Sequence, residues 1–167
     1  FLLTNAQVST VYGDDESSLY YGSAFVQHMA SLSDVGIFNY QGDKYVYLES
    51  PNDQLWENSY ENMIKLIQDI IYHTKGKPEY HNLYQMTRIW RTLIFHRLTD
   101  IYGDVPYSEA GLAFYEQIYR PKYDPQKDIY MDMLRELEEA VDALDPAQEN
   151  FGEYDIAYKG DLEKWKK

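Results

Sequence analysis

The chain has 167 residues, 44% of them apolar, which is enough for one domain with its own core and excludes a disordered chain. Its formal net charge of −13 argues against a nucleic-acid ligand, because phosphate contacts need a basic stripe and the 15 Lys and Arg residues are scattered. The sequence contains no cysteine, so neither a disulfide nor a thiolate metal site is expected.

The first third of the chain predicts two helices followed by a loop. Apolar residues at helical spacing favour helices over residues 2–11 and 16–32. Residues 36–53 form a predicted loop between strong helices, in which the region of Tyr45 and Tyr47 favours an extended conformation. Loops on a rigid scaffold carry binding residues disproportionately, so this segment is a candidate for function.

Residues 54–73 and 78–102 predict a helical hairpin. The first helix has its apolar side chains on one face, whereas the second carries them around most of its circumference and must be covered on several sides. Pro78 suits the first turn of the second helix, and Gly103 can take the left-handed conformation that ends it. Because only residues 74–77 separate the two helices, they must pack antiparallel.

The last third predicts a long loop and two further helices. Residues 103–124 are dense in tyrosine, and we expect these tyrosines to pack over the helix ends. Asp124 is the expected N-cap of a helix that continues to Leu144, and Asp161 is the expected N-cap of a final helix. The predicted fold is therefore all-α. Helical hairpins in series predict a tetratricopeptide-like superhelix with long aromatic-rich loops.

Eighteen tyrosines, three tryptophans and six phenylalanines make the chain unusually aromatic. A tyrosine joins a flat apolar face to a hydroxyl, so it can pack on the CH-rich face of a sugar ring and also hydrogen-bond to it. Neutral, polyhydroxylated ligands suit such surfaces. The predicted ligand-binding residues lie in the loop of residues 36–53 and are Asn39, Tyr40, Asp43, Tyr45 and Tyr47. The alternative is that this loop is only a solvated connection.

Patterns for catalysis or metal binding are weak. Glu138 and Asp142 lie one turn apart, but glycosidases hold paired carboxylates across a cleft on different elements, so we expect the acids of this helix to be solvated. His96 and Asp100 could both ligate a metal, yet no third ligand is evident and a buried hydrogen bond between them is the better interpretation. We therefore expect no enzymatic activity, no metal and no cofactor.

Five segments, in order, resemble one protein family. They read LLTNAQ (2–7), LWENSY (55–60), FHRLTDIYGDVPYSEA (95–110), PKYDPQKDIYMDMLRELEEAVDAL (121–144) and YKGDLEKWKK (158–167). Together they resemble the SusD/RagB family of nutrient-binding lipoproteins on the outer membrane of Bacteroidetes-type bacteria, in particular its SusD-like second subgroup. By this resemblance, residues 1–167 are identified as the N-terminal part of a single SusD-like helical domain, which we expect to be incomplete at both ends.

The resemblance also implies a function and its partners. Members of the family capture an oligosaccharide ligand at the cell surface and deliver it to a TonB-dependent SusC-like transporter, over which they form a lid. Their ligand surface draws on the loop before the helix that LWENSY begins, although no individual residue carries over by identity. The resemblance further implies an outward-facing lipoprotein of the outer membrane, whose lipid-modified cysteine lies upstream and is missing from this chain.

Three alternatives stay open on the sequence alone. The same lid could bind peptide, as in the RagB branch of the family. The helical repeats could serve as an interaction scaffold without any small ligand. The full-length protein could also be a hydrolase, which would require turnover of a glycan.

Overall fold

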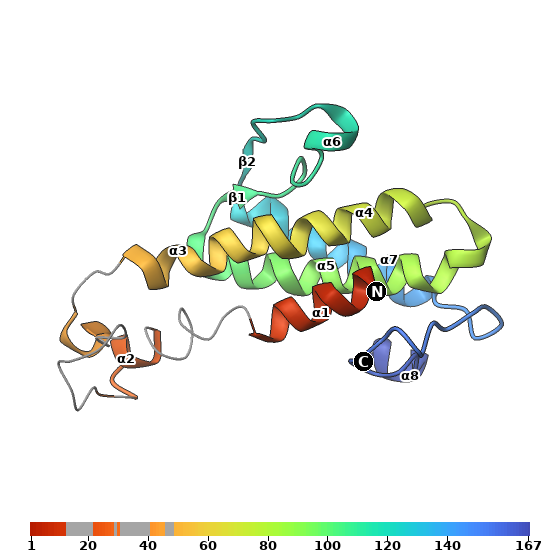
Figure 1. Cartoon of the computed structure of the whole chain (residues 1–167), viewed down its shortest axis with the longest axis horizontal. Coiled ribbons are helices and arrows are strands. Elements are labelled where there is room, and N and C mark those ends of the chain that lie inside the picture. Colours follow the sequence, from red (N-terminus) through yellow and green to blue (C-terminus); the bar gives the residue numbers. More distant parts are fainter. Residues whose placement is uncertain (13–21, 29, 31–40, 46–48) are drawn as a thin grey trace.

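The structure is a computed structural model that describes residues 1–12, 22–28, 30, 41–45 and 49–167. Within these residues it is built almost entirely of helices, and the two-residue strands β1 (Val105–Pro106) and β2 (Tyr123–Asp124) form the only sheet (Figure 1). The strands are antiparallel, with Val105 opposite Asp124. The prediction of an all-α fold is confirmed.

A long helical rod runs through the molecule (Figure 1). It consists of α3 (Glu49–Asn58), the π-helical η3 (Ser59–Ile64) and α4 (Lys65–Thr74), joined by right-handed helical backbone angles at the junctions. The rod begins at Glu49, so the loop prediction was wrong for residues 49–53. The reason is that Pro51 lies in the first turn, where its missing N–H breaks no helical hydrogen bond.

Helix α5 (His81–Tyr102) follows the 3-10 turn η4 (Pro78–Tyr80) and lies antiparallel to α4, as predicted (Figure 1). Gly103 ends α5 with a φ of 75°. The centre of the core lies where the rod meets α5, and its buried apolar side chains include Met63, Ile64, Ile67, Ile94, Phe95 and Leu98. The expectation that α5 is covered on several sides holds only in part, because Leu93 and Ile101 remain 41% and 44% exposed.

Helix α7 (Gln126–Ala143) packs on α5 through Ile129, Met133 and Ala140, which are all buried. The predicted N-cap of this helix was wrong. The N–H of Gln126 donates instead to the carboxylate of Asp104, at 2.8 Å. Asp124 pairs in β2 and uses its carboxylate to accept hydrogen bonds from the loop that begins after β1.

The N-terminal helix α1 (Leu2–Tyr12) packs against α4 and η3, close to its predicted bounds. The predicted helix over residues 16–32 was wrong in its described C-terminal half. There only α2 (Ser23–Phe25) is α-helical, and a turn follows in which Gln27 has a φ of 63°. Residues 13–21 lie outside the described residues.

The C-terminal segment returns to α1, so that both ends of the chain lie on one side of the hairpin (Figure 1). Asp161 caps α8 (Leu162–Trp165) by accepting a hydrogen bond from the N–H of Lys164, as predicted. Nearby, the carboxylate of Asp155 is buried and accepts a hydrogen bond from the amide of Gln7 at 2.8 Å. In the part of the chain that the structure describes, no helix combines the length and apolarity needed to cross a membrane.

Candidate functional site

The segment predicted to bind ligand is described only in part. Asn39, Tyr40 and Tyr47 lie outside the described residues, so their predicted role stays a prediction. Asp43 lies in the 3-10 helix η2 (Gln41–Lys44), and Tyr45 lies in the turn that follows it. Tyr45 has a φ of 57°, so the expected extended conformation was wrong at this residue.

Asp43 and Tyr45 share a surface with α2 that the sequence did not reveal; we call it the Phe25–Tyr45 surface. The rings of Phe25 and Tyr45 meet edge to face, with centroids 5.4 Å apart and an interplanar angle of 82°. The two side chains are 37% and 63% exposed. The side-chain amide of Gln27 donates to the backbone carbonyl of Asp43 at 3.1 Å, which ties the two segments together.

The backbone of this surface is unusual. Gln27 and Tyr45 both have positive φ values, of 63° and 57°, although neither is glycine. Such conformations are uncommon and cluster at binding and catalytic sites, where the surrounding structure must hold them. An exposed aromatic edge beside the exposed side-chain amide of Gln27 can pack on the apolar face of a neutral ring and bond its hydroxyls.

A second aromatic cluster lies where α3, α5 and β2 meet. The ring of Trp56 stacks on that of Tyr123, with centroids 6.0 Å apart, and also contacts Tyr60 and Tyr102 at 4.8 and 5.2 Å. The backbone N–H of Trp56 donates to the hydroxyl of Tyr102 at 3.2 Å. Tyr123 is 62% exposed, so the cluster reaches the surface. Sequence analysis did not find this cluster, because its members come from three separated segments.

The tyrosines inside the scaffold act as packed hydrogen-bond donors, as expected for Tyr60 and Tyr107. The hydroxyl of Tyr60 donates to the carbonyl of Pro106 at 2.7 Å, and burial raises the pKa of Tyr60. The hydroxyl of Tyr107 donates to Asp132 at 2.8 Å, and burial raises the pKa of Tyr107 to about 12. Both hydroxyls therefore keep their protons at neutral pH. Tyr119, by contrast, does not pack over a helix end, because it is 76% exposed.

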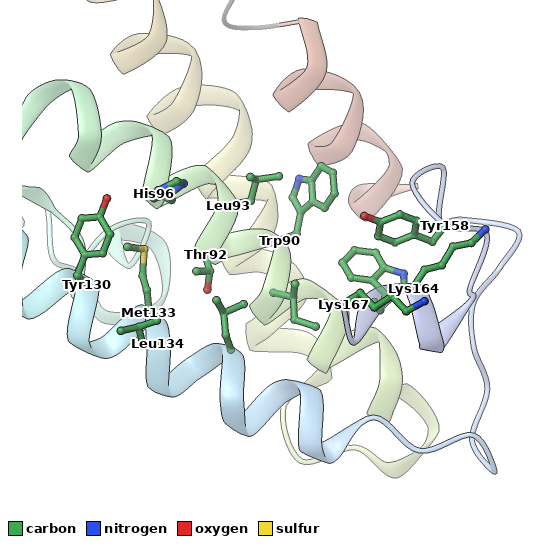
Figure 2. A pocket seen from close by; sticks show the side chains of 13 residues that line it. Trp90, Thr92, Leu93, His96, Tyr130, Met133, Leu134, Tyr158, Lys164 and Lys167 are labelled. Atoms are coloured by element: carbon green, nitrogen blue, oxygen red, sulfur yellow. The ribbon is translucent and has the colours of Figure 1, made fainter.

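An open groove of about 430 Å³ lies between α5, α7 and the C-terminal segment (Figure 2). Trp90 and Leu93 reach it from α5, and Met133 and Leu134 reach it from α7. Most of its lining surface is apolar, and its polar side chains are spread along its length: Thr92, His96, Tyr130, Tyr158, Lys164 and Lys167. A sugar ring needs several convergent polar groups around an apolar face, so this groove suits an apolar partner better than a carbohydrate.

The acids of α7 are not all solvated, which corrects the prediction. Arg88, only 11% exposed, donates to Glu136 through Nε at 2.8 Å and to Glu139 through Nη2 at 2.7 Å. The hydrogen bond from Arg88 lowers the pKa of Glu136. These two carboxylates therefore serve an ion pair between α5 and α7, and Glu138 and Asp142 remain on the exposed face.

His96 and Asp100 are in contact, with Nε2 and Oδ2 3.2 Å apart. The two side chains therefore pair as expected, but the expectation of burial was wrong, because they are 48% and 37% exposed. Asp100 also accepts a hydrogen bond from the hydroxyl of Tyr130. Across the described residues, no three His, Asp or Glu side chains lie close enough together to hold a metal ion.

Comparison with known proteins identifies the family. A family model described as SusD-like, "Starch-binding associating with outer membrane", matches residues 1–167. The chain belongs to the SusD-like family. No curated protein matches it.

Solved structures support the same assignment. A chitin-binding protein is 35% identical to this SusD-like chain, with a TM-score of 0.86 over 99% of the chain and 35% of the solved structure. A protein described as Bacteroidetes AC2a SusD-like is 29% identical, with a TM-score of 0.81 over 99% and 30%. A chitin-binding SusD homolog from Flavobacterium johnsoniae is 26% identical, with a TM-score of 0.76 over 99% and 34%.

The SusD-like chain thus spans about a third of the length of these solved structures. Within that third it has the same helical architecture, in which the rod and α5 form the central hairpin. This hairpin carries the Trp56 cluster, at the place where the rod meets β2.

Proposed function

We propose that this SusD-like chain is part of a cell-surface protein that binds glycan and delivers it to a TonB-dependent SusC-like transporter at the outer membrane. The family match over residues 1–167 carries the proposal. Two of the similar solved structures are described as chitin-binding, so oligosaccharides of chitin are the first ligands to test. The delivery step and the lipid anchor are inferred from the family resemblance.

The Phe25–Tyr45 surface is our candidate for ligand contact, together with Asn39, Tyr40 and Tyr47 of the same predicted segment. The chemistry of its exposed side chains supports this candidate. An exposed aromatic edge beside the amide of Gln27 offers both the apolar face and a polar group that a neutral sugar needs. The net charge of −13 disfavours anionic ligands, which agrees with a neutral oligosaccharide.

We propose binding without cleavage. Two carboxylates of α7, Glu136 and Glu139, form ion pairs with Arg88, and the candidate pair Glu138 and Asp142 lies on a single exposed helix face. A glycosidase needs two carboxyl groups that face a bound sugar from opposite sides, one of them free to give up a proton. An ion pair with Arg88 keeps the Glu136 carboxyl ionised, which suits packing and not proton donation.

Isothermal titration calorimetry on the full-length protein that carries this chain tests the proposal. Chitohexaose and maltoheptaose are titrated, with a tryptic peptide mixture as the competing class of ligand. We expect saturable heat with an oligosaccharide, and Tyr45→Ala should weaken that binding by about 10-fold through loss of ring stacking. The matched control is Tyr154→Ala, another partly exposed tyrosine, 43% exposed, which should bind like the wild type.

Each alternative has its own outcome in the same experiment. Heat with peptide and with no oligosaccharide would replace the proposal with a peptide-binding lid. The absence of binding heat with every ligand would favour an interaction scaffold. Release of shorter sugars during the titration, sustained after repurification, would indicate a hydrolase.

A further inference from the structure

A compact group of aromatic side chains stands on the surface where α6 (Ala113–Glu116) lies against the last turns of α4; we call it the aromatic ledge. It consists of Tyr72 and His73 from α4, and Phe114 and Tyr115 from α6. The rings of Tyr72 and Tyr115 are stacked, with centroids 3.8 Å apart and an interplanar angle of 19°. Phe114 meets Tyr115 edge to face at 5.2 Å, and His73 meets Tyr72 in the same way at 5.5 Å.

The ledge is exposed although its members are large and apolar. Phe114 is 87% exposed and Tyr72 is 57% exposed. Isolated exposed apolar residues are ordinary, but neighbouring ones that are already packed on each other mark a surface that contacts something else. Tyr115 contacts both Phe114 and Tyr72, so the three rings form one group and not separate exposures.

The ledge is also fixed in position. The hydroxyl of Tyr115 donates to the carboxylate of Asp69, one turn before Tyr72 on α4. This hydrogen bond raises the pKa of Tyr115 to about 12, so the hydroxyl remains a donor at neutral pH. Just before α6, Gly111 approaches α4 so closely that a Cβ there would lie 3.1 Å from the Cβ of Gln68. Two attachments therefore hold α6 on α4 with its aromatic rings outward.

We infer that the aromatic ledge is a second carbohydrate contact, which packs on the apolar face of one neutral sugar ring. Stacked rings supply the flat apolar surface. The imidazole of His73 and the carboxylate of Asp69 lie on the same turns of α4 as Tyr72, and the carboxylate of Glu116 follows Tyr115 on α6, so these groups can bond hydroxyls. The inference rests on the proposed glycan-binding function and adds a second site to it.

Other ligand classes fit the ledge less well. The acidic side chains around it and the net charge of −13 oppose phosphates and other anions. A stable protein partner needs roughly 800 Å² on each side, which is more than four side chains expose. A single ring stacked on aromatic side chains needs far less area, so the size of the ledge suits one sugar residue.

The ledge is distinct from the Phe25–Tyr45 surface. Tyr72 lies near the far end of the rod that begins at Glu49, on the order of 30 Å away along a helix. Figure 1 shows α2 beside the start of the rod and α6 on its other side. One short oligosaccharide cannot touch both surfaces, so the ledge should matter most for long chains and polysaccharide.

A fluorine probe on the full-length protein tests the ledge directly. 4-Trifluoromethylphenylalanine is placed at Phe114, and its ¹⁹F signal is followed during titration with chitohexaose and with maltoheptaose. We expect a saturable shift that disappears in Tyr72→Ala and survives in Tyr72→Phe, which keeps the ring. The same probe at Tyr119, on the same segment and 76% exposed, should not shift.

Affinity electrophoresis in gels that contain glycol chitin or soluble starch gives the second readout. The double variant Tyr72→Ala and Phe114→Ala should bind polysaccharide about 3- to 10-fold more weakly. Circular dichroism checks that it is folded. A contrary outcome is that calorimetry shows an oligosaccharide binding while the ¹⁹F signal at Phe114 does not shift and the double variant migrates like the wild type. In that case the ledge is not a sugar contact, and the proposed function stands. If no glycan binds the wild type at all, both proposals fail.

Discussion

Asp155 offers the sharpest test of how the C-terminal segment is held on α1. The residue is 2% exposed, and the groups that donate to its carboxylate are neutral: an amide, an indole and backbone N–H groups. Oδ1 accepts from the amide of Gln7 at 2.8 Å and from the N–H of Ala157 at 3.0 Å. Oδ2 accepts from the indole of Trp165 at 2.8 Å and from the N–H of Gly160 at 2.9 Å.

Replacing this carboxylate by an amide removes acceptors without changing the shape of the side chain. In Asp155→Asn one carboxylate oxygen is replaced by an NH₂ group. This group cannot accept hydrogen bonds, yet it must face the donors that bonded to the oxygen it replaces. With the oxygen kept toward Trp165 and Gly160, the bonds from Gln7 and Ala157 are lost, and the amide of Gln7, which is 0% exposed, stays buried. Hydrogen bonds to a charged group contribute about 1.5–3 kcal/mol each, so we expect the free energy of unfolding to fall by about 3 kcal/mol.

The contribution of Asp155 to the stability of the fold should depend on pH. Burial by itself would raise the pKa of Asp155, but the hydrogen bonds from Gly160, Trp165 and Gln7 outweigh it and lower the pKa below its ordinary value. A carboxyl whose pKa is lower in the folded state stabilises the fold above its unfolded pKa, and this contribution is lost as the pH falls through the folded pKa. The wild type should therefore lose its advantage over Asp155→Asn below about pH 4.

Urea unfolding, followed by tryptophan fluorescence from pH 7 to pH 3, measures both effects. Asp161→Asn is the matched control, because Asp161 is an exposed N-cap on the same segment and Asn caps a helix about as well as Asp. A difference below about 0.5 kcal/mol between the wild type and Asp155→Asn at pH 7, or a difference that does not shrink in acid, would refute the account.

Three further predictions concern the scaffold. Arg88→Met should lower the free energy of unfolding by about 2–4 kcal/mol, because it leaves Glu136 unpaired in a partly buried place. Urea titration measures this free energy, and a variant as stable as the wild type would contradict the prediction. Tyr60→Phe removes the hydrogen bond to Pro106 and should lower stability by about 1 kcal/mol, seen as a drop in Tm; an unchanged Tm would show that the bond is energetically neutral. In Gly103→Ala the new Cβ would have no atom within 4 Å, but the residue must keep a φ of 75°. We therefore expect about 1–2 kcal/mol of backbone strain, measured as a loss of stability in calorimetric unfolding. A more stable variant would mean that this φ is not required.

The helices were predictable where a periodic apolar stripe defines them. The rod, α5 and α7 bury side chains at steps of three and four, and this period is visible in the sequence without any knowledge of their partners. Helix ends were less predictable. Asp124 looks like an N-cap by its place before Pro125, but in the structure Asp104, which directly precedes β1, accepts the hydrogen bond from α7.

The candidate site was predictable only as a segment. An aromatic loop before a strong helix could be recognised, and Tyr45 was named within it. Its partner Phe25 could not be found, because the sequence predicted one continuous helix over residues 16–32, whereas α2 ends at Phe25. The aromatic ledge was missed for the same physical reason, since Tyr72 and Tyr115 are 43 residues apart and meet only when α6 folds back on α4.

The sequence by itself determined the helical class, the hairpin of the rod and α5, and the family, because local periodicity and short ordered segments are properties of neighbouring residues. Tertiary structure alone decided which aromatic rings meet, which acids are paired with Arg88, and that Asp155 is buried among N–H donors. Each of these depends on contacts between residues far apart in the chain, and such contacts are set by how whole helices and loops pack, which no local pattern encodes.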